Sequence, residues 1–301
     1  MKETFRDIKK TTLEKANIIL AGIPFDKNAS LGSGTSYAPP FLRALSNNIP
    51  GVTKDAKLLD KVRLFDYGDI NQFENEAIAT YFHRVEKEIT PLIRKSALSL
   101  FIGGDHSVNI PLFKAFLSFA KRENKIPVLI HIDAHPDMMD EYLGNRLSHA
   151  CPARRALDHG LKQENLTFVG LRGFEKEEVI YFNENPVIKV YLASDVHQMG
   201  IEKITNEIIT KYQDDKYAIY VSYDIDANDP SFAPGTGTPE AFGLKSSDTL
   251  FITSALVALP NTYVLDIVEV SPTLDTNDIT SWLALKTMYE LFYIVGEKDN
   301  A

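Results

Sequence analysis

The sequence predicts an α/β protein, a single three-layer domain whose mostly parallel sheet of about eight strands is covered by helices on both faces. Two observations support this fold class. Short β-rich apolar runs alternate with segments of helical periodicity, and the runs are almost continuously apolar, which is typical of strands buried on both faces. No repeat, low-complexity tract or Pro/Gly-rich linker divides the chain, so we expect one domain over residues 1–301.

The expected elements follow one another along the chain. Eight apolar runs are expected to be strands, at residues 17–22, 62–66, 97–102, 128–133, 166–170, 187–192, 217–224 and 263–269. Helical patterns lie between several of them, at residues 40–47, 78–94, 110–123, 152–159, 204–212, 247–258 and 281–295. Open parallel sheets bind ligands beyond the carboxyl ends of their strands, so chemistry is expected where these runs end.

Composition limits the class of function. The net charge of −9 argues against a nonspecific nucleic-acid binder and suits a small cationic substrate. Cys151 is the only cysteine, so no intrachain disulfide can form and a reducing compartment is expected. The N-terminal residues 1–15 lack an apolar signal-peptide core, and no later apolar run approaches the roughly 20 residues needed to span a bilayer. We therefore expect a cytoplasmic protein without a membrane partner.

Two segments place acidic or imidazole side chains on alternate residues where an apolar run ends. The first segment carries Asp133, His135 and Asp137, and the second carries Asp224 and Asp226. In an extended chain, alternate residues point to the same side. If the two strands are neighbours, five ligand-type groups converge.

A sixth candidate is His106, which follows another apolar run that ends in a pair of glycines. Four carboxylates packed this closely would repel one another unless cations neutralised them, and two divalent ions supply four positive charges. Oxygen-rich ligation with some imidazole favours Mn²⁺, whereas Zn²⁺ more often takes Cys or more His, although iron, cobalt and nickel stay open. His131 is expected to be satisfied by a neighbouring group rather than to be a third histidine ligand. The sequence therefore predicts a two-manganese centre.

Together these motifs resemble the ureohydrolase family, which includes arginases and agmatinases, and they look closest to agmatinases. The motifs that carry the resemblance span most of the chain, at residues 22–26, 32–34 with Pro39 and Leu42-Arg43, 103–107, 133–137, 222–239 and 268–272. The resemblance implies an arginase-like fold and a homo-oligomer, a trimer or a hexamer. It also implies two Mn²⁺ per chain, one held by His106, Asp133, Asp137 and Asp224, the other by Asp133, His135, Asp224 and Asp226.

The resemblance also implies roles for His149 and Glu269. A guanidinium carbon is a poor electrophile, so its hydrolysis needs a strong nucleophile, which two metals provide by lowering the pKa of a shared water. We expect this bridging hydroxide, oriented by Asp137, to attack the carbon. His149 would pass a proton to the departing amine, and Glu269 would hold the planar guanidinium by charge-assisted hydrogen bonds. The products would be urea and an amine.

The substrate is the least determined feature. The spacing of Asn145, Ser148 and His149 and the Gly-Thr-Pro-Glu run at 237–240 look more like agmatinases than arginases, so agmatine, which would give putrescine for polyamine biosynthesis, is the first choice. Two departures from agmatinases are Pro136 and the Ala-Phe-Gly run at 241–243, whose Phe242 would narrow the pocket or fill space under the loop. Asn145 and Arg146 are further candidates for substrate binding.

Several alternatives stay open. Arg146, if near the substrate tail, would repel the amine of agmatine and attract the carboxylate of a guanidino acid, whereas a solvent-exposed Arg146 would do neither. Arginine and formiminoglutamate are other substrates of the resembled class. An alternative of a different class is a catalytically inactive, metal-binding regulatory homologue, against which the intact His149 and Glu269 count.

Overall fold

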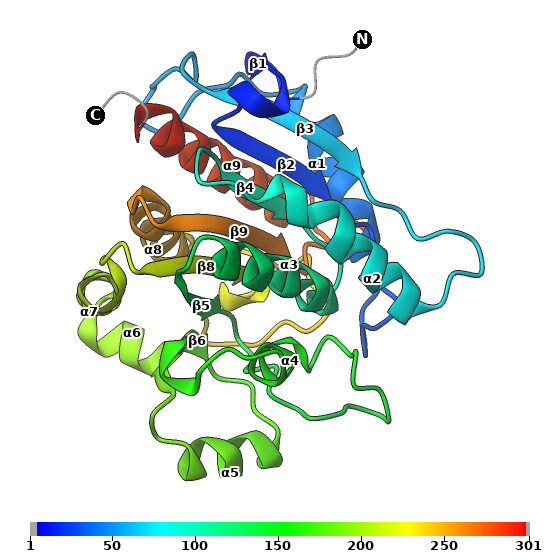
Figure 1. Cartoon of the computed structure of the whole chain (residues 1–301), viewed down its shortest axis with the longest axis vertical. Coiled ribbons are helices and arrows are strands. Elements are labelled where there is room, and N and C mark those ends of the chain that lie inside the picture. The colour runs from blue at the N-terminus through cyan, green and yellow to red at the C-terminus, as the bar shows by residue number, and fades with distance from the viewer. Residues whose placement is uncertain (1–4, 299–301) are drawn as a thin grey trace.

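The computed structural model describes residues 5–298, whose nine strands form one sheet in which every adjacent pair is parallel (Figure 1). The strands are β1 (Lys9–Lys10), β2 (Ile18–Gly22), β3 (Arg63–Asp69), β4 (Leu98–Ile102), β5 (Ile126–Ile132), β6 (Leu166–Leu171), β7 (Lys189–Leu192), β8 (Tyr217–Asp224) and β9 (Thr262–Val268). Their order is β1-β3-β2-β4-β9-β8-β5-β6-β7. The expected α/β class is confirmed, and all eight expected strands are present. The ninth, β1, consists of two exposed lysines at the sheet edge, where no apolar run could reveal it.

The helices follow the predicted pattern with two additions. They are α1 (Ala38–Ser46), α2 (Ile78–Ile89), α3 (Asn109–Arg122), α4 (Pro152–Asp158), α5 (Lys176–Glu184), α6 (Ala193–Met199), α7 (Ile201–Tyr212), α8 (Ser246–Ala258) and α9 (Ile279–Lys298). The sequence analysis did not predict α5 or α6. It also made α2 too long: the helix ends at Ile89, and a 3-10 turn follows that contains Pro91, which has no amide hydrogen to continue the helical hydrogen bonds.

Two buried hydrophobic clusters separate the layers. Along β5, Val128 and Ile130 belong to one cluster and Leu129 to the other, as the two-residue period of a strand requires. The first cluster joins the sheet to α1, α7, α8 and α9, and the second joins it to α2, α3 and α4. The expected three-layer arrangement is therefore confirmed. No helix within residues 5–298 is both long and apolar enough to cross a membrane.

Candidate active site

The candidate site lies beyond the carboxyl ends of the four central strands, β4, β9, β8 and β5, which are neighbours in that order. Asp224 is the last residue of β8, Asp133 directly follows β5, and Glu269 directly follows β9. His106 begins a 3-10 turn shortly after β4. Parallel strands end on the same edge, so four segments that are far apart in the sequence meet at one place.

A tight turn delivers His106 to this place. Gly104 packs so closely on Phe25 that a Cβ atom would lie 1.7 Å from the Phe25 carbonyl oxygen, so no larger residue fits there. The Asp105 amide then donates to the same oxygen at 2.8 Å. The Asp105 carboxylate accepts from the Ser107 amide at 3.0 Å and caps the turn. The sequence analysis named the glycine pair but not Asp105 as the residue that fixes the turn.

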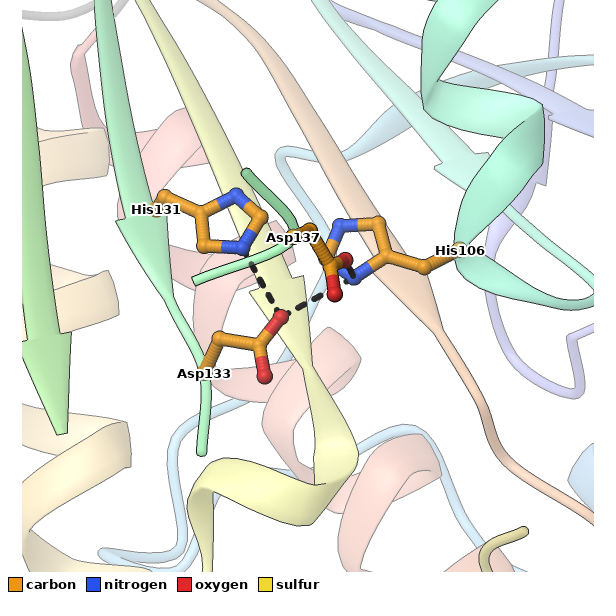
Figure 2. A group of neighbouring side chains, drawn as sticks. All are labelled: His106, His131, Asp133 and Asp137. Atoms are coloured by element: carbon orange, nitrogen blue, oxygen red, sulfur yellow. Dashed lines mark ion pairs between the residues drawn. The ribbon is translucent and has the colours of Figure 1, made fainter. Parts of the chain in front are cut away.

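The first group of candidate ligands surrounds Nδ1 of His106. One carboxylate oxygen each of Asp133, Asp137 and Asp224 lies 3.0 Å from that nitrogen, and all four residues are buried. Figure 2 shows Asp133, Asp137 and His106 directed toward one another. His131 stacks on His106 with ring centroids 4.7 Å apart, and its Nε2 lies 2.8 Å from Asp133 Oδ2.

A second group adjoins the first and shares Asp133 with it. His135 Nδ1 lies 3.1 Å from Asp226 Oδ2 and 3.6 Å from Asp133 Oδ1. Asp133 thus presents one oxygen to each group, as a bridging ligand would. Asp224 presents Oδ2 to His106, while its Oδ1 accepts from the Asp226 amide at 2.8 Å. The bridging role expected of Asp224 stays a prediction.

The charge balance of this cluster calls for cations. Five buried atoms of the cluster have no hydrogen-bond partner among the described residues: Nδ1 of His106, both ring nitrogens of His131, and Oδ2 of both Asp133 and Asp137. The expectation that a neighbouring group satisfies His131 by a hydrogen bond is therefore wrong. Burial raises the pKa of Asp224, and the charges of Asp226 and Asp133 raise it further. Burial alone would lower the pKa of His106, but Asp137 and the other surrounding carboxylates hold it well above its ordinary value. Buried oxygen and imidazole donors that lack partners are the donor set of a divalent metal, so the residues fit a metal centre.

Two site residues have strained backbones. Asp137 has φ of 54° and Glu269 has φ of 60°, in the left-handed region that residues other than glycine rarely adopt. Glu269 is held there because its amide donates to the Gly104 carbonyl at 2.9 Å and its Oε1 accepts from the His106 amide at 2.8 Å. The strain aims both carboxylates into the site.

His149 lies between Glu269 and Ser30. Its Nδ1 is 3.1 Å from Glu269 Oε1, and its Nε2 is within reach of the Ser30 amide at 3.1 Å and the Ser30 hydroxyl at 2.9 Å. The amide can donate to a neutral ring, and the hydroxyl can accept from a protonated one. His149 therefore has a partner in either protonation state, as a proton carrier requires. The sequence analysis missed Ser30, which no motif spacing distinguishes from other loop serines.

Removing the charge of Glu269 should change the titration of His149. Burial opposes protonation of the ring, but the hydrogen bond and charge of Glu269 outweigh it and raise the pKa of His149 to about 9. Glu269→Gln is expected to lower this pKa toward the ordinary 6.5, measured by ¹H–¹⁵N NMR of the metal-free protein. The pair stabilises the fold fully below pH 6.5 and ceases to do so as the pH rises through 9, so the variant's stability deficit should shrink across that window.

The matched control is Glu240→Gln, which neutralises a carboxylate of the same cavity that makes no described contact with His149. It is expected to leave the titration of His149 in place. An unchanged His149 pKa in Glu269→Gln would contradict the assigned pairing.

Two residues predicted to bind substrate lie away from the cavity wall. Asn145 donates to Asn28 Oδ1 at 3.0 Å and accepts from the Leu147 amide at 2.9 Å, so it shapes the loop that carries His149. Arg146 is half-exposed and pairs with Asp140 and Asp158. Neither placement supports direct substrate contact, which stays a prediction for both.

The departure at Phe242 also has a definite placement. The residue is 83% exposed and does not line the cavity, so it neither narrows the pocket nor fills space under the loop. Both expectations for this residue are wrong.

The candidate ligands line a cavity of about 300 Å³, large enough for a small ligand. Its floor is formed by His106, His135, Asp137, Asp224 and Asp226, with His149 and Glu269 beside them. Its outer wall consists of Ser30, Leu31, Met139, Tyr142, Ala150, Phe174, Glu175, Pro239 and Glu240. The cavity is also lined by the buried Gly173 and Glu178 and by Thr238, whose hydroxyl donates to Asp226 Oδ2 at 3.2 Å.

An all-parallel sheet with two adjoining His/Asp groups beside a cavity at the carboxyl ends of its central strands defines a class, that of α/β proteins with a candidate metal centre. More particularly, the chain matches the model of the Arginase family over residues 16–293 and belongs to that family. It is a ureohydrolase, a hydrolase that acts on linear amidine C–N bonds, and its resemblance to agmatinases is confirmed.

Relatives named for different substrates are similar to the chain. The mitochondrial guanidino acid hydrolase of Homo sapiens is 31% identical over 286 residues, which cover 94% of this chain and 79% of the relative. The agmatinase of Bacillus anthracis is 30% identical over 288 residues, covering 93% and 92%. Among solved structures, the agmatine ureohydrolase of Thermoplasma volcanium has a TM-score of 0.83 and 31% identity, covering 96% of this chain and 93% of its own. Family membership therefore leaves the substrate open.

Proposed function

We propose that this protein is a binuclear manganese enzyme that hydrolyses agmatine to urea and putrescine. The observation that carries the choice of agmatine is the charge of the cavity. Besides Glu269 and the candidate metal ligands, three glutamates line it: Glu175 and Glu240 at its exposed side, and Glu178, whose pKa burial raises to about 7. The described lining residues include no lysine or arginine. A cavity of this charge favours a substrate with a second cationic group over one that ends in a carboxylate.

Each side chain of the site has a separate role in hydrolysis. Two bound Mn²⁺ would supply the nucleophile at neutral pH by lowering the pKa of a water between them. Glu269 receives the planar guanidinium through charge-assisted hydrogen bonds and fixes the carbon above the floor of the cavity. His149, which Glu269 releases when the guanidinium takes its place, gives a proton to the departing amine and regains one through the solvent-facing side near Ser30.

The outer wall suits the rest of agmatine. Leu31, Met139 and Phe174 offer apolar surface for a methylene chain, and Glu240 stands at the same wall with 45% of its side chain exposed. A terminal ammonium near Glu240 would keep part of its hydration and gain an ion pair. Such a partly exposed pair is worth about 0.2–1 kcal/mol.

The test is urea release by the Mn²⁺-loaded protein on agmatine, arginine, 4-guanidinobutyrate and 3-guanidinopropionate, with formamide release measured on formiminoglutamate. Agmatine is expected to have the highest kcat/KM. A guanidino acid or arginine as the best substrate would contradict agmatine specificity but keep the class of reaction. Formamide from formiminoglutamate alone would indicate the formimino-hydrolase branch. Turnover of none, with metal bound, would favour the inactive regulatory homologue.

Glu240→Gln tests the tail contact within the same panel. The ratio of kcat/KM for agmatine to that for 4-guanidinobutyrate is expected to fall by up to about fivefold, since the variant removes a pair of the strength given above. Using this ratio cancels any effect on the shared chemistry. Arg146→Ala is the control: because Arg146 pairs with surface carboxylates, its ratio should equal that of the parent. An unchanged ratio in Glu240→Gln would contradict the contact between Glu240 and the substrate tail. A changed ratio in Arg146→Ala would contradict the assignment of Arg146 to the surface.

The proposal includes a homo-oligomer of three or six chains, which sedimentation would measure. Manganese is proposed because four carboxylates outnumber two imidazoles among the six candidate ligands, which are His106, Asp133, His135, Asp137, Asp224 and Asp226. Metal analysis of the protein purified without added metal would test that choice.

A further inference from the structure

The side of the His106 ring that faces away from the cavity also has a buried hydrogen-bond partner. Its Nε2 lies 2.9 Å from the hydroxyl of Ser222, which is on β8 and fully buried. That hydroxyl donates in turn to Oδ1 of Asp266, on β9, at 2.8 Å. A continuous chain of buried groups therefore runs from the carboxylate of Asp266 to the imidazole of His106.

The hydrogen bonds of Ser222 determine the direction of this chain. A hydroxyl has one proton to donate and two lone pairs to accept with. Its proton goes to Asp266, and one lone pair accepts from Nδ2 of Asn109 at 3.1 Å. The remaining position faces His106, so Ser222 accepts there and Nε2 of His106 carries the hydrogen. The lone pair of the imidazole is then on Nδ1, which faces the three carboxylates.

Asp266 is suited to hold this arrangement in place. It is fully buried, and each of its oxygens accepts two hydrogen bonds. Oδ1 accepts from Ser222 and from the Tyr223 amide at 3.3 Å, and Oδ2 accepts from Tyr220 at 2.6 Å and Asn109 at 2.9 Å. Four donors match the four acceptor positions of an ionised carboxylate, which therefore has no proton to offer back to Ser222.

Asp266 has no part in the reaction described above. It makes no described contact with a candidate ligand except through Ser222, and it does not line the cavity. Removing a carboxylate from water is costly even when it is hydrogen-bonded, so a buried carboxylate points to a role in the fold or the site. Its most direct connection is to the orientation of His106.

We propose that Asp266 is a positioning residue that, through the hydroxyl of Ser222, orients His106 and makes Nδ1 its metal-facing nitrogen. The inference rests on the proposed metal centre and extends it to residues that touch neither metal nor substrate. Carboxylates that fix a histidine ligand from behind typically change metal affinity by 10- to 100-fold when removed. Here a serine hydroxyl stands between the carboxylate and the ring.

The experiment measures Mn²⁺ affinity of the metal-free full-length protein by competition with a chelator. Ser222→Ala interrupts the hydrogen-bond path from Asp266 to His106. Asp266→Asn removes the charge of the carboxylate while keeping the shape of the side chain. Each is expected to weaken one of the two manganese sites by 10- to 100-fold and to leave the other within about threefold. Two separate substitutions keep the test valid if one of them prevents folding.

Tyr220→Phe is the matched control. It deletes the hydrogen bond to Oδ2 of Asp266 in the same buried network, and its ring stays packed between Phe113 and Phe116. The path from Oδ1 through Ser222 to His106 is untouched, so both manganese affinities should stay within about threefold of the parent. A role of the network in stability alone would give the three variants equal affinities, and that result would overturn the proposal.

A spectroscopic measurement tests the hydrogen bond between His106 and Ser222 even if the variants bind Mn²⁺ as tightly as the parent. In the Zn²⁺-loaded protein, the Nε2 hydrogen of His106 should resonate downfield and exchange slowly with solvent, and it should lose both properties in Ser222→Ala. Fast exchange of this hydrogen in the parent would contradict the hydrogen-bond path from His106 through Ser222 to Asp266. If the parent binds no divalent ion at all, the proposed function itself fails; two ions bound with equal affinity in all variants would refute only the role of Asp266.

Discussion

Asp133→Asn is expected to leave at most one manganese ion per chain and to lower kcat/KM for agmatine by at least about 10³-fold. Asp133 presents one oxygen to each of the two ligand groups, so its loss affects both sites together. Asparagine keeps the volume of the side chain but removes the negative charge that draws both ions. Metal analysis after desalting and a urea-release assay measure the two effects.

The control for this substitution is Asp215→Asn, the same change at a surface carboxylate that is 90% exposed and pairs with Lys125. It should keep two manganese ions and the activity of the parent. Two ions retained in Asp133→Asn, with activity within tenfold of the parent, would show that Asp133 does not bridge the centre.

His149→Asn is expected to lower kcat by about 10²- to 10⁴-fold while the manganese content stays at two per chain. His149 contacts Glu269 and Ser30, and none of the candidate ligands, so the centre should form without it. Asparagine can still reach a hydrogen-bond partner but cannot carry a proton near neutral pH. Steady-state urea release and metal analysis on the same sample separate the two effects.

His83→Asn on the exposed face of α2 is the control and should behave as the parent does, since the His83 side chain is 61% exposed. If His149→Asn lost its metal together with its activity, His149 would belong to the centre and not to proton transfer. Activity within threefold of the parent would refute the proton-carrier role.

The candidate ligands could be predicted because Asp133, His135 and Asp137 alternate directly after an apolar run. The extended geometry expected for them is not what the structure shows: β5 ends at Ile132 and Asp137 has a φ of 54°, so a turn brings these residues together. Their convergence with Asp224 depended on strand order, which periodicity cannot supply. The structure provides it: β5 and β8 are adjacent, with Ile132 beside Tyr223.

No pattern in the sequence indicated the other parts of the site. Asp266 lies inside an apolar strand, and only the fold reveals that Ser222 stands between it and His106. Arg146 is three residues before His149 and was a reasonable candidate for the pocket. A left-handed turn at Leu143 and Gly144, with φ of 51° and 76°, precedes it, and its side chain pairs with carboxylates at the surface. Such turns are set by single backbone angles, which a residue pattern does not determine.

The fold elements that were missed have similar causes. The α5 segment is held at its start by reciprocal contacts between Glu175 and Glu178, and most of its length is exposed, so it has little apolar periodicity. Sequence patterns reveal what a segment buries, and a segment that buries little is difficult to predict.

The strand order has a consequence for folding. β9, residues 262–268, inserts between β4, residues 98–102, and β8, so the middle of the sheet cannot close until nearly the whole chain has been made. Pairing of strands so distant in sequence is intrinsically slow. Ions that bind only the completed arrangement would stabilise the last step of assembly and none of the earlier ones. The chain thus gains its affinity for metal, and with it the capacity to hydrolyse, in the same event that completes its sheet.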